Sequence, residues 1–409
     1  MSLVVQKYGG TSVANIEKIR NVARKVIRAK ESGNGVVVVL SAMAGETDKL
    51  VHLANSASDN PNPREYDVLV STGEQITISL LAIVLESMGY KARSFLGHQI
   101  KILTDQAYRS ARIVKIETKV IEEELKNGSI VIVAGFQGVD VKNNITTLGR
   151  GGSDTSAVAL AAALKADVCE IYTDVDGVYT TDPNIQEKAR KLEKVSYEEM
   201  LELASAGAKV LHPRSVELAK KYGVPVYVKS SFNDEMGTLV TKEDVEMERE
   251  VVSGVTYDKN QAKVTVVHLP DKPGIAARLF TPLSDRNIMV DMIIQNSSLD
   301  GYTDMTFTVP KKEIGEVKEI LDKVTKDFGA QGVQYDEKIS KISIIGVGMR
   351  SHSGVASKMF ASLAQDGINI MMISTSEIKI SCVIDAKYTE LAVRVLHEAF
   401  GLDKEIEKI

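Results

Sequence analysis

The sequence predicts an α/β sandwich on a mainly parallel β-sheet, followed by two small α+β modules. Three observations carry this prediction. Short apolar segments alternate with amphipathic helical segments over roughly the first 230 residues. A charged stretch then follows, and an internal repeat occupies the remainder. The length of 409 residues also favours several domains, because a single hydrophobic core rarely serves so long a chain.

Nearly continuous apolar segments predict strands that helices cover on both faces, and they occupy residues 36–40, 130–134, 170–173 and 224–228. An earlier strand is indicated at residues 3–5. Between the strands, apolar residues recur at helical spacing in 16–27, and residues 157–166 form an alanine-rich helix. Ser196 and Glu199 have the spacing of a capping box ahead of a helix over residues 200–206.

The charged stretch 241–250 predicts a linker or connecting helix. After it, the sequence from Lys263 matches the sequence from Lys341. Gly274 pairs with Gly354 and Met292 with Met372, each eighty positions apart, and each copy predicts strand, turn, helix and strand. We therefore expect domains at 1–245, 246–340 and 341–409.

Composition excludes several classes of protein. The net charge is −5 with a pI of about 5.8, which does not favour a nucleic-acid partner. Cys169, Cys382 and six scattered histidines show no metal-ligand spacing. We see no signal-peptide pattern and no apolar run near the roughly twenty residues that cross a bilayer, so a soluble, cytoplasmic protein without a membrane partner is expected.

Three polar stretches could carry chemistry, and each also has a purely structural interpretation. The first is "QKYGGTS", where Lys7 precedes Gly9 and Gly10 between a strand and a helix. Glycine N–H groups at a helix start can hold an anion, and the lysine adds a full charge. An ordinary tight turn is the alternative.

The second stretch is "TTLGRGGSDTSA", in which glycines permit close backbone approach and Arg150 offers a fork for a carboxylate or phosphate. Ser153 or Asp154 would cap the alanine-rich helix. A flexible hairpin before a plain cap is the alternative here. The third stretch, "YTDVDGVYTTDP", follows a strand, where doubly wound sheets place ligand loops, although it could be only a turn. It lacks the glutamate that a calcium loop needs.

Together with "VVVVLSAMAGETDKL", "STGEQ" and "AGFQGV", these stretches occur in the order typical of aspartokinases, and the chain resembles that branch of the amino-acid-kinase superfamily. The two repeats, one with "DKPG", resemble paired ACT domains. The resemblance covers essentially the whole chain. It implies the amino-acid-kinase three-layer sandwich followed by two ferredoxin-like ACT domains.

The resemblance implies transfer of the γ-phosphoryl group of ATP to the side chain of L-aspartate, giving 4-phospho-L-aspartate for lysine, threonine and methionine synthesis. Lys7 and Asp154 would be the catalytic pair. The residues implied for ATP are Lys7, Tyr8, Gly9, Gly10, Ser41, Thr173, Asp174, Tyr179, Asp182 and Lys209. Where many relatives have arginine after "TDP", this chain has Asn184, which puts one phosphate contact in doubt.

Aspartate has a side-chain pKa of about 3.9 and is ionised at neutral pH, so it needs no general base. Catalysis must come from alignment and charge neutralisation, with Mg²⁺ arriving on ATP and no metal ligand from the protein. We therefore interpret Asp154 as an organiser of Lys7 or of the substrate. The resemblance places the substrate amine near Glu74, its carboxylate near Arg150 and Ser153, and Thr47 at the acceptor end. Glu74 in a solvated helix turn and Thr47 as a cap are the structural alternatives.

The ACT-like pair implies feedback inhibition by lysine, threonine or both, and a dimer or larger homo-oligomer through these domains. A separate regulatory subunit started at Met247 is also possible. Candidate effector residues are Asp271, Gly274, Gln295, Asn296, Asn369, Ile370 and Thr375, each of which could equally be a turn or strand residue. Rival functions are a related kinase acting on glutamate, N-acetylglutamate, carbamate or UMP, and a non-catalytic amino-acid sensor.

Overall fold

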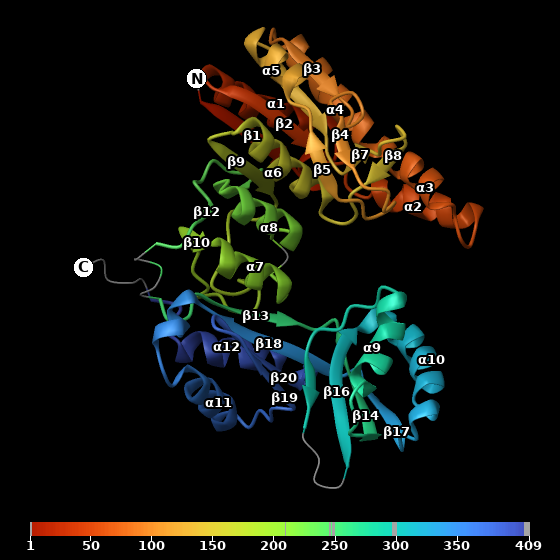
Figure 1. The fold of residues 1–409 in the computed structure, drawn as a ribbon. Helices are drawn as coiled ribbons and strands as arrows, with labels where there is room; N and C mark the ends of the chain where they lie inside the picture. The colour runs from red at the N-terminus through yellow and green to blue at the C-terminus, as the bar shows by residue number, and fades with distance from the viewer. Residues whose placement is uncertain (1, 209, 245–246, 248–249, 297–300, 405–409) are drawn as a thin grey trace. The chain divides into compact units, whose positions relative to one another are not determined.

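A computed structural model of the chain describes residues 2–208, 210–244, 247, 250–296 and 301–404. It divides the chain into two compact units (Figure 1). The first unit takes residues 1–179, 191–205 and 209–247, and the second takes 180–190, 206–208 and 248–409. Two short segments within the expected kinase half therefore belong to the C-terminal unit.

An eight-stranded sheet forms the centre of the first unit, in the order β10-β12-β11-β9-β1-β2-β6-β3. All neighbouring strands pair in parallel except β11 and β12, as the apolar segments predict. The strands are β1 (Leu3–Tyr8), β2 (Gly35–Leu40), β3 (Ala92–Phe95), β6 (Ile130–Ala134), β9 (Val168–Thr173), β10 (Lys194–Ser196), β11 (Val226–Ser230) and β12 (Thr238–Thr241).

Helices pack on both faces of this sheet (Figure 1). α1 (Ile16–Glu31) and α4 (Thr72–Ser87) bury their apolar sides against β2 and β6, while α6 (Gly152–Leu164) and α8 (Pro213–Tyr222) belong to the other layer. Since isoleucine, valine and leucine fill both sides of β2 and β6, the sheet needs cover on each face. The remaining helices are the 3₁₀ turn η1 (Gly10–Val13), α2 (Glu46–Ala57), α3 (Pro63–Val70), α5 (Lys119–Lys126) and α7 (Tyr197–Ser205).

The predicted capping box is confirmed at the start of α7. The Ser196 N–H donates to Glu199 at 3.1 Å, and the Glu199 N–H donates back to Ser196 Oγ at 3.1 Å. A second, small sheet in this unit has the order β5-β4-β7-β8. Its strands are β4 (Ile102–Thr104), β5 (Ile113–Ile116), β7 (Gln137–Val139) and β8 (Ile145–Thr147).

The second unit contains two antiparallel four-stranded sheets, each with its own helices and apolar core. One sheet, β15-β16-β14-β17, is made of β14 (Gln261–Pro270), β15 (Ile293–Gln295), β16 (Tyr302–Pro310) and β17 (Gly332–Asp336), with α9 (Ile275–Asp285) and α10 (Ile314–Val324). The other, β13-β18-β20-β19, is made of β13 (Gly254–Asp258), β18 (Ile339–Ile345), β19 (Met372–Thr375) and β20 (Lys379–Asp385), with α11 (Val355–Gln365) and α12 (Thr389–Ala399). Short 3₁₀ turns lie at Lys311–Glu313, Lys326–Phe328, Val347–Ser351 and Ala386–Tyr388.

The two modules do not follow the expected boundary at residue 341. Strand β13 lies early in the chain, yet it pairs antiparallel with β18 of the later module. The predicted linker over 241–250 falls partly outside the described residues.

Equivalent lysines of the two repeats contact the opposite module with different partners. Lys341, which is buried, forms an ion pair with Asp291. Its repeat equivalent Lys263 points its Nζ at Met371 Sδ, 3.9 Å away. The two repeats therefore share the order of their helices and strands, but their equivalent lysines differ in whether they pair with a carboxylate.

The segment 180–190 is held inside the second unit by several side chains. Thr180 Oγ1 lies 2.9 Å from Nε2 of the buried His397, and the Tyr257 hydroxyl donates to Asp182 at 2.9 Å. Arg394 donates to the Ile185 carbonyl, also at 2.9 Å. This segment thus has the C-terminal modules as its structural support.

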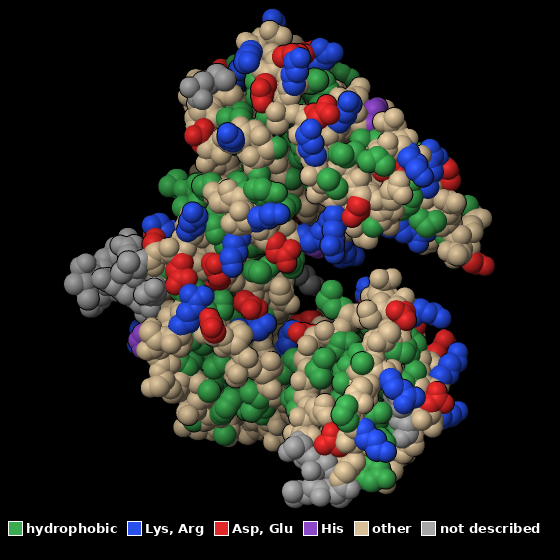
Figure 2. All heavy atoms as spheres, in the orientation of Figure 1, with side chains coloured by type: hydrophobic (Ala, Val, Ile, Leu, Met, Phe, Trp, Pro, Cys, Tyr) green, Lys and Arg blue, Asp and Glu red, His purple; other side chains and the backbone are tan. Residues whose placement is uncertain are grey.

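Helices α3 and α4 form a nearly continuous run, Pro63–Ser87, that is long and apolar enough to cross a membrane, which sequence reading missed. Half of its most apolar window is buried inside the unit, and Ile78, Leu81 and Leu85 join the core. A core helix accounts for it. On the face in Figure 2, basic and acidic side chains are interspersed over the described surface.

Candidate active site

A cavity of about 390 Å³ opens at the carboxyl ends of β1 and β2. Carboxyl ends of parallel strands meet at one edge of a sheet, so loops far apart in sequence converge there. Nine of the predicted residues line it, namely Lys7, Gly9, Gly10, Ser41, Thr47, Glu74, Arg150, Ser153 and Asp154.

Lys7 and Asp154 form an ion pair at the wall of this cavity. The Lys7 Nζ lies 2.6 Å from Asp154 Oδ1, and both side chains are nearly buried. Asp154 lies in the first turn of α6, where the helix dipole favours an anion. Because burial weakens the solvation of both charges, each depends on the other. The pair holds the ammonium group in place at the cavity.

The glycine loop after β1 is joined to the loop after β2. The Ala44 N–H donates to the Gly10 carbonyl at 3.2 Å, and the Ser41 N–H donates to the Tyr8 carbonyl at 3.2 Å. A Cβ at Gly10 would lie only 2.9 Å from the Ala42 carbonyl oxygen. A residue without a side chain is therefore required where the two loops meet.

Glu74 lies in the first turn of α4 and is almost fully buried, with 2% of its surface exposed. Its Oε1 accepts a hydrogen bond from the Ala42 N–H at 3.1 Å, whereas Oε2 has no partner among the described residues. Burial raises the pKa of Glu74 to about 8. A cation in the cavity would supply both the missing partner and the charge that favours the ionised form.

Arg150 lies between two glycines in the left-handed region, Gly149 with φ of +77° and Gly151 with φ of +70°. Its side chain is exposed and lines the cavity. Within the described parts of the chain, no hydrogen bond or ion pair involves its guanidinium. Ser153 follows in the first turn of α6. This arrangement leaves a planar cation available for an anion.

Sequence reasoning gave no role to Phe136 and Asp48, which also line the cavity. Phe136 has φ of +67°, which is unusual for a bulky residue. Its N–H donates to Ser156 Oγ at 3.1 Å and its carbonyl accepts from the Leu148 N–H at 2.8 Å, so the turn is fixed on both sides. The glycines of "AGFQGV" were the only signal of this turn.

The other described residues predicted for the nucleotide do not line this cavity. Tyr8 has a fully buried side chain stacked on Tyr172, with ring centroids 4.6 Å apart, so only its backbone faces the loop region. Thr173 donates to Asp174 at the carboxyl end of β9. The Tyr179 hydroxyl donates to Asp176 at 2.9 Å.

Two further nucleotide predictions fall elsewhere. Asp182 lies in the second unit, where it accepts hydrogen bonds from the Tyr257 hydroxyl and from the Asn184 side chain. Lys209 lies outside the described residues.

The predicted effector residues are distributed over both modules of the second unit. Asp271 donates its N–H to the Gly301 carbonyl, and Gly274 precedes α9 with φ of +91°. Gln295 ends the edge strand β15, and Thr375 ends the edge strand β19. Ile370 packs on the core of the second module. Asn296 follows β15, where its carbonyl accepts from Thr303, and Asn369 precedes β19.

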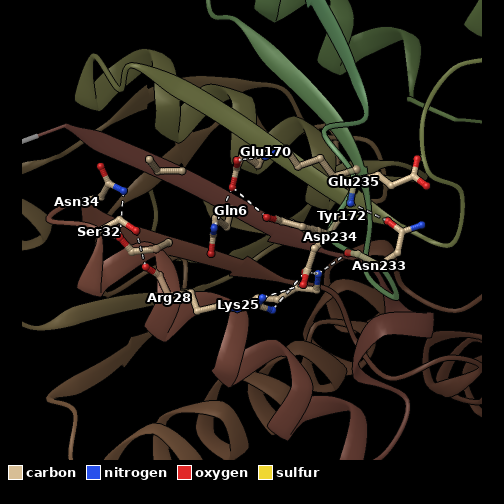
Figure 3. Close-up of a pocket in the computed structure, with 13 residues that line it drawn as sticks. Gln6, Lys25, Arg28, Ser32, Asn34, Glu170, Tyr172, Asn233, Asp234 and Glu235 are labelled. Atoms are coloured by element: carbon tan, nitrogen blue, oxygen red, sulfur yellow. Dashed lines mark hydrogen bonds and ion pairs between the residues drawn. The ribbon is translucent and has the colours of Figure 1, made fainter. Parts of the chain in front are cut away.

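A second cavity, of about 300 Å³, lies on the other face of the sheet (Figure 3). Neighbouring residues of a strand point to opposite faces, so Lys7 faces the first cavity and Gln6 the second. Figure 3 shows side chains of α1, β1, β9 and the loop after β11 pointing toward one another. All six charged residues of its lining are ion-paired, namely Lys25, Arg28, Glu170, Lys229, Asp234 and Glu235.

Comparison with protein families assigns both units of the chain. The sequence profile of the amino acid kinase family matches residues 2–230, and profiles of ACT domains match residues 263–326 and 342–400. An aspartate kinase of Pseudomonas putida is 56% identical over 404 residues, with 98% of each chain covered.

Solved structures give the same assignment. A crystal structure of Escherichia coli aspartokinase III in complex with aspartate and ADP has a TM-score of 0.82 and 27% identity, covering 97% of this chain and 99% of that one. The same enzyme in complex with lysine and aspartate has a TM-score of 0.78, also at 27% identity and with the same coverage.

Proposed function

The chain belongs to the aspartate kinases of the amino acid kinase family, and from this premise we propose that it phosphorylates the side-chain carboxylate of L-aspartate with ATP, giving 4-phospho-L-aspartate and ADP. One observation carries the proposal. Within the described residues, a single cavity combines the Lys7–Asp154 ion pair with a Glu74 carboxylate oxygen and an Arg150 guanidinium that have no hydrogen-bond partner.

The chemistry needs charge neutralisation more than proton transfer. An oxygen of the ionised aspartate side chain attacks the γ-phosphorus, the bond to the β,γ-bridging oxygen breaks, and ADP leaves with that electron pair. Lys7 would stabilise negative charge on the phosphoryl group during transfer, and Asp154 would hold its ammonium in position. The N–H groups of Gly9 and Gly10 would receive the phosphates.

The other cavity residues fit the two ends of the amino acid. Glu74 is suited to the α-ammonium group because its Oε2 has no partner within the part of the chain that the structure describes. Arg150 and Ser153 are suited to the α-carboxylate, and Thr47 to the acceptor end. An N-acetylated or amine-free acceptor would leave the buried Glu74 without its cation, which argues against the rival kinases.

The nucleotide would extend from the glycine loop toward Thr173 and Asp174 at the end of β9, and toward Tyr179 in the segment that follows. Mg²⁺ would enter on its phosphates. Among the residues that the structure describes, no cluster of three or more histidine, cysteine or acidic side chains is suited to a metal. Because Mg²⁺ prefers oxygen ligands, the phosphate oxygens of the nucleotide would hold the ion.

Aspartate-dependent formation of ADP tests the proposal. The purified protein should release ADP from MgATP with L-aspartate and not with L-glutamate, N-acetyl-L-glutamate, carbamate or UMP. Hydroxylamine should trap the acyl phosphate as the hydroxamate. Equal turnover with another acceptor would favour a rival kinase, and no turnover with any of them would favour a non-catalytic sensor.

Feedback control by lysine, threonine or both through the ACT domains is part of the same proposal, and it fits a cytoplasmic enzyme that supplies lysine, threonine and methionine synthesis. A relative is known bound to lysine. Assembly through these domains is supported by the edge strands β15 and β19, where Ile293 is 51% and Ile373 41% exposed. Lysine and threonine added singly and jointly to the assay test the effector, and light scattering tests the homo-oligomer. Expression of a chain started at Met247 tests for a separate regulatory subunit.

A further inference from the structure

The loop that carries Arg150 needs support from outside itself. Gly149, Gly151 and Gly152 surround the arginine, and a glycine-rich chain samples many conformations. An arginine that must meet a carboxylate in one geometry loses much of its binding advantage if its backbone moves. The side chains that fix this loop therefore matter to the site even when they touch no substrate.

Arg214, in the first turn of α8, is the main such side chain on one side. Its guanidinium donates to the Leu148 carbonyl at 2.5 Å and to the Ala111 carbonyl at 2.9 Å. Leu148 is two residues before Arg150. The ring of His212, which caps α8, also lies so close to Gly151 that a Cβ there would be 2.2 Å from its Cγ. The start of α8 thus contacts the loop on both sides of Arg150.

Asp67, in α3, holds the same loop through Thr147, the last residue of the preceding strand β8. This fully buried carboxylate accepts the Thr147 N–H and the Thr147 hydroxyl, each at 2.8 Å. It also accepts the Arg109 N–H at 3.0 Å. Charged acceptors form stronger hydrogen bonds than neutral ones, so the end of β8 is firmly held.

Between these two anchors, the N–H and carbonyl groups of Thr147 and Leu148 are all hydrogen-bonded. The Thr147 carbonyl accepts from Ala111, the Leu148 N–H donates to Phe136, and the Leu148 carbonyl accepts from Arg214. The chain is therefore fixed up to the residue before Gly149. Only Gly149 separates Arg150 from this fixed backbone.

We propose that Arg214 is a positioning residue for Arg150, with Asp67 as its counterpart on the opposite side of the loop. The two side chains fix the backbone from which Arg150 reaches the α-carboxylate of the substrate. Neither touches the substrate. The inference rests on the proposed aspartate kinase function and adds residues to which neither the cavity lining nor the sequence motifs assign a role.

A double-mutant cycle tests the proposal. Arg214→Met should raise the KM for aspartate about tenfold and leave the KM for MgATP within about twofold, because only the carboxylate end of the site loses its support. Arg150→Met should raise the KM for aspartate about a hundredfold. The double variant should be no worse than Arg150→Met alone, since Arg214 acts through Arg150.

Three further measurements separate a positioning role of Arg214 from an effect on folding and from the mere loss of a positive charge. Arg112→Met is the matched control. This exposed arginine is next to Ala111, whose carbonyl accepts from Arg214, but among the described residues its side chain makes no hydrogen bond to the Arg150 loop. The KM of this variant for aspartate should be unchanged. Arg214→Lys, which can still reach one carbonyl, should be intermediate. With L-aspartic acid α-amide, which has no α-carboxylate, Arg214→Met should turn over as wild type does.

Additive effects of Arg214→Met and Arg150→Met would overturn the proposal, as would equal rises in the KM values for aspartate and MgATP. If Arg214→Met fails to fold by circular dichroism, Arg214→Lys and Asp67→Asn replace it in the same cycle, and additivity would count against the proposal there too. Absence of aspartate-dependent ADP release by the wild type would instead contradict the proposed function, so the two failures are distinct.

Discussion

The two cavities of the kinase unit lie on opposite faces of the same strands and differ in how their charges are satisfied. In the cavity of Figure 3, Glu170 accepts from Lys229, Gln6 and Tyr172, and every other charged side chain is ion-paired. In the cavity that Lys7 lines, Oε2 of Glu74 has no partner among the described side chains and backbone groups. The charged side chains of one cavity thus have partners within the protein, whereas the other cavity retains a carboxylate oxygen that a cationic ligand would satisfy.

Similar volume therefore says little about function in this fold. A buried polar group without a partner costs about 1–3 kcal/mol, so a stable protein retains one only where something compensates. Glu74 carries such a cost, while Glu170 does not. The following variants test this contrast, beginning with the largest expected effect.

Lys7→Met should lower kcat by about 10³-fold, because it removes the ammonium group expected to neutralise the phosphoryl group in transfer. The rate of aspartate-dependent ADP release measures this. Lys25→Met, in the paired cavity, is the control and should stay within about twofold of wild type. Comparable losses in both variants would contradict the functional distinction between the cavities.

Glu74→Gln should raise the KM for aspartate by about 10- to 100-fold, since a charge-assisted bond to the substrate ammonium contributes about 1.5–3 kcal/mol. Initial-rate kinetics with varied aspartate give this number. The KM for MgATP should change little. An unchanged KM for aspartate would remove Glu74 from substrate recognition.

The pH dependence of kcat/KM for aspartate should follow the ionisation of Glu74. Its pKa of about 8 means that the carboxyl group is mostly neutral at lower pH and cannot pair with an ammonium group. The value of kcat/KM should therefore rise by roughly 25-fold from about pH 6.5 to about pH 8.5 and level off above about pH 9. Glu74→Gln should lose this rise, and a rise that persists in the variant would assign it to another group.

Replacement of Glu74 and of Glu170 by glutamine should change the free energy of unfolding in opposite directions. In the folded chain the pKa of Glu74 is raised from 4.5 to about 8, so its contribution to stability falls as pH rises through that window, and Glu74→Gln should stabilise the protein near pH 7 by roughly 1 kcal/mol. Glu170→Gln should destabilise it by roughly 1–2 kcal/mol, because Lys229 loses its anion. Thermal unfolding midpoints at two pH values measure both shifts. Shifts of the same sign would refute the contrast.

Much of this site was predictable because its residues lie in local patterns at strand ends. The glycine pair after Lys7 and the glycines around Arg150 mark two loops, and a parallel sheet brings such loops to one edge. The pairing of Lys7 with Asp154 agrees with the organising role expected for Asp154, whose contribution to catalysis stays a prediction.

What the sequence did not reveal depends on contacts between distant segments. Arg214 meets Leu148 across 66 positions and Asp67 meets Thr147 across 80, with no local pattern to announce either contact. The turn at Phe136 was missed because propensity disfavours a bulky residue in the left-handed region. Asp182 follows a turn expected to bind nucleotide, yet its partner Tyr257 lies 75 positions later.

The eleven residues from Thr180 to Arg190 have a consequence for dissecting this enzyme. A gene shortened to encode only residues 1–245 would retain this peptide while deleting Tyr257, Arg394 and His397, to which it is bonded. Loss of activity in such a fragment would then report an unsupported insertion rather than a missing effector site. Co-expression of the deleted half as an independent polypeptide would restore those partners. The two halves are therefore better studied as complementing fragments than by deleting one of them.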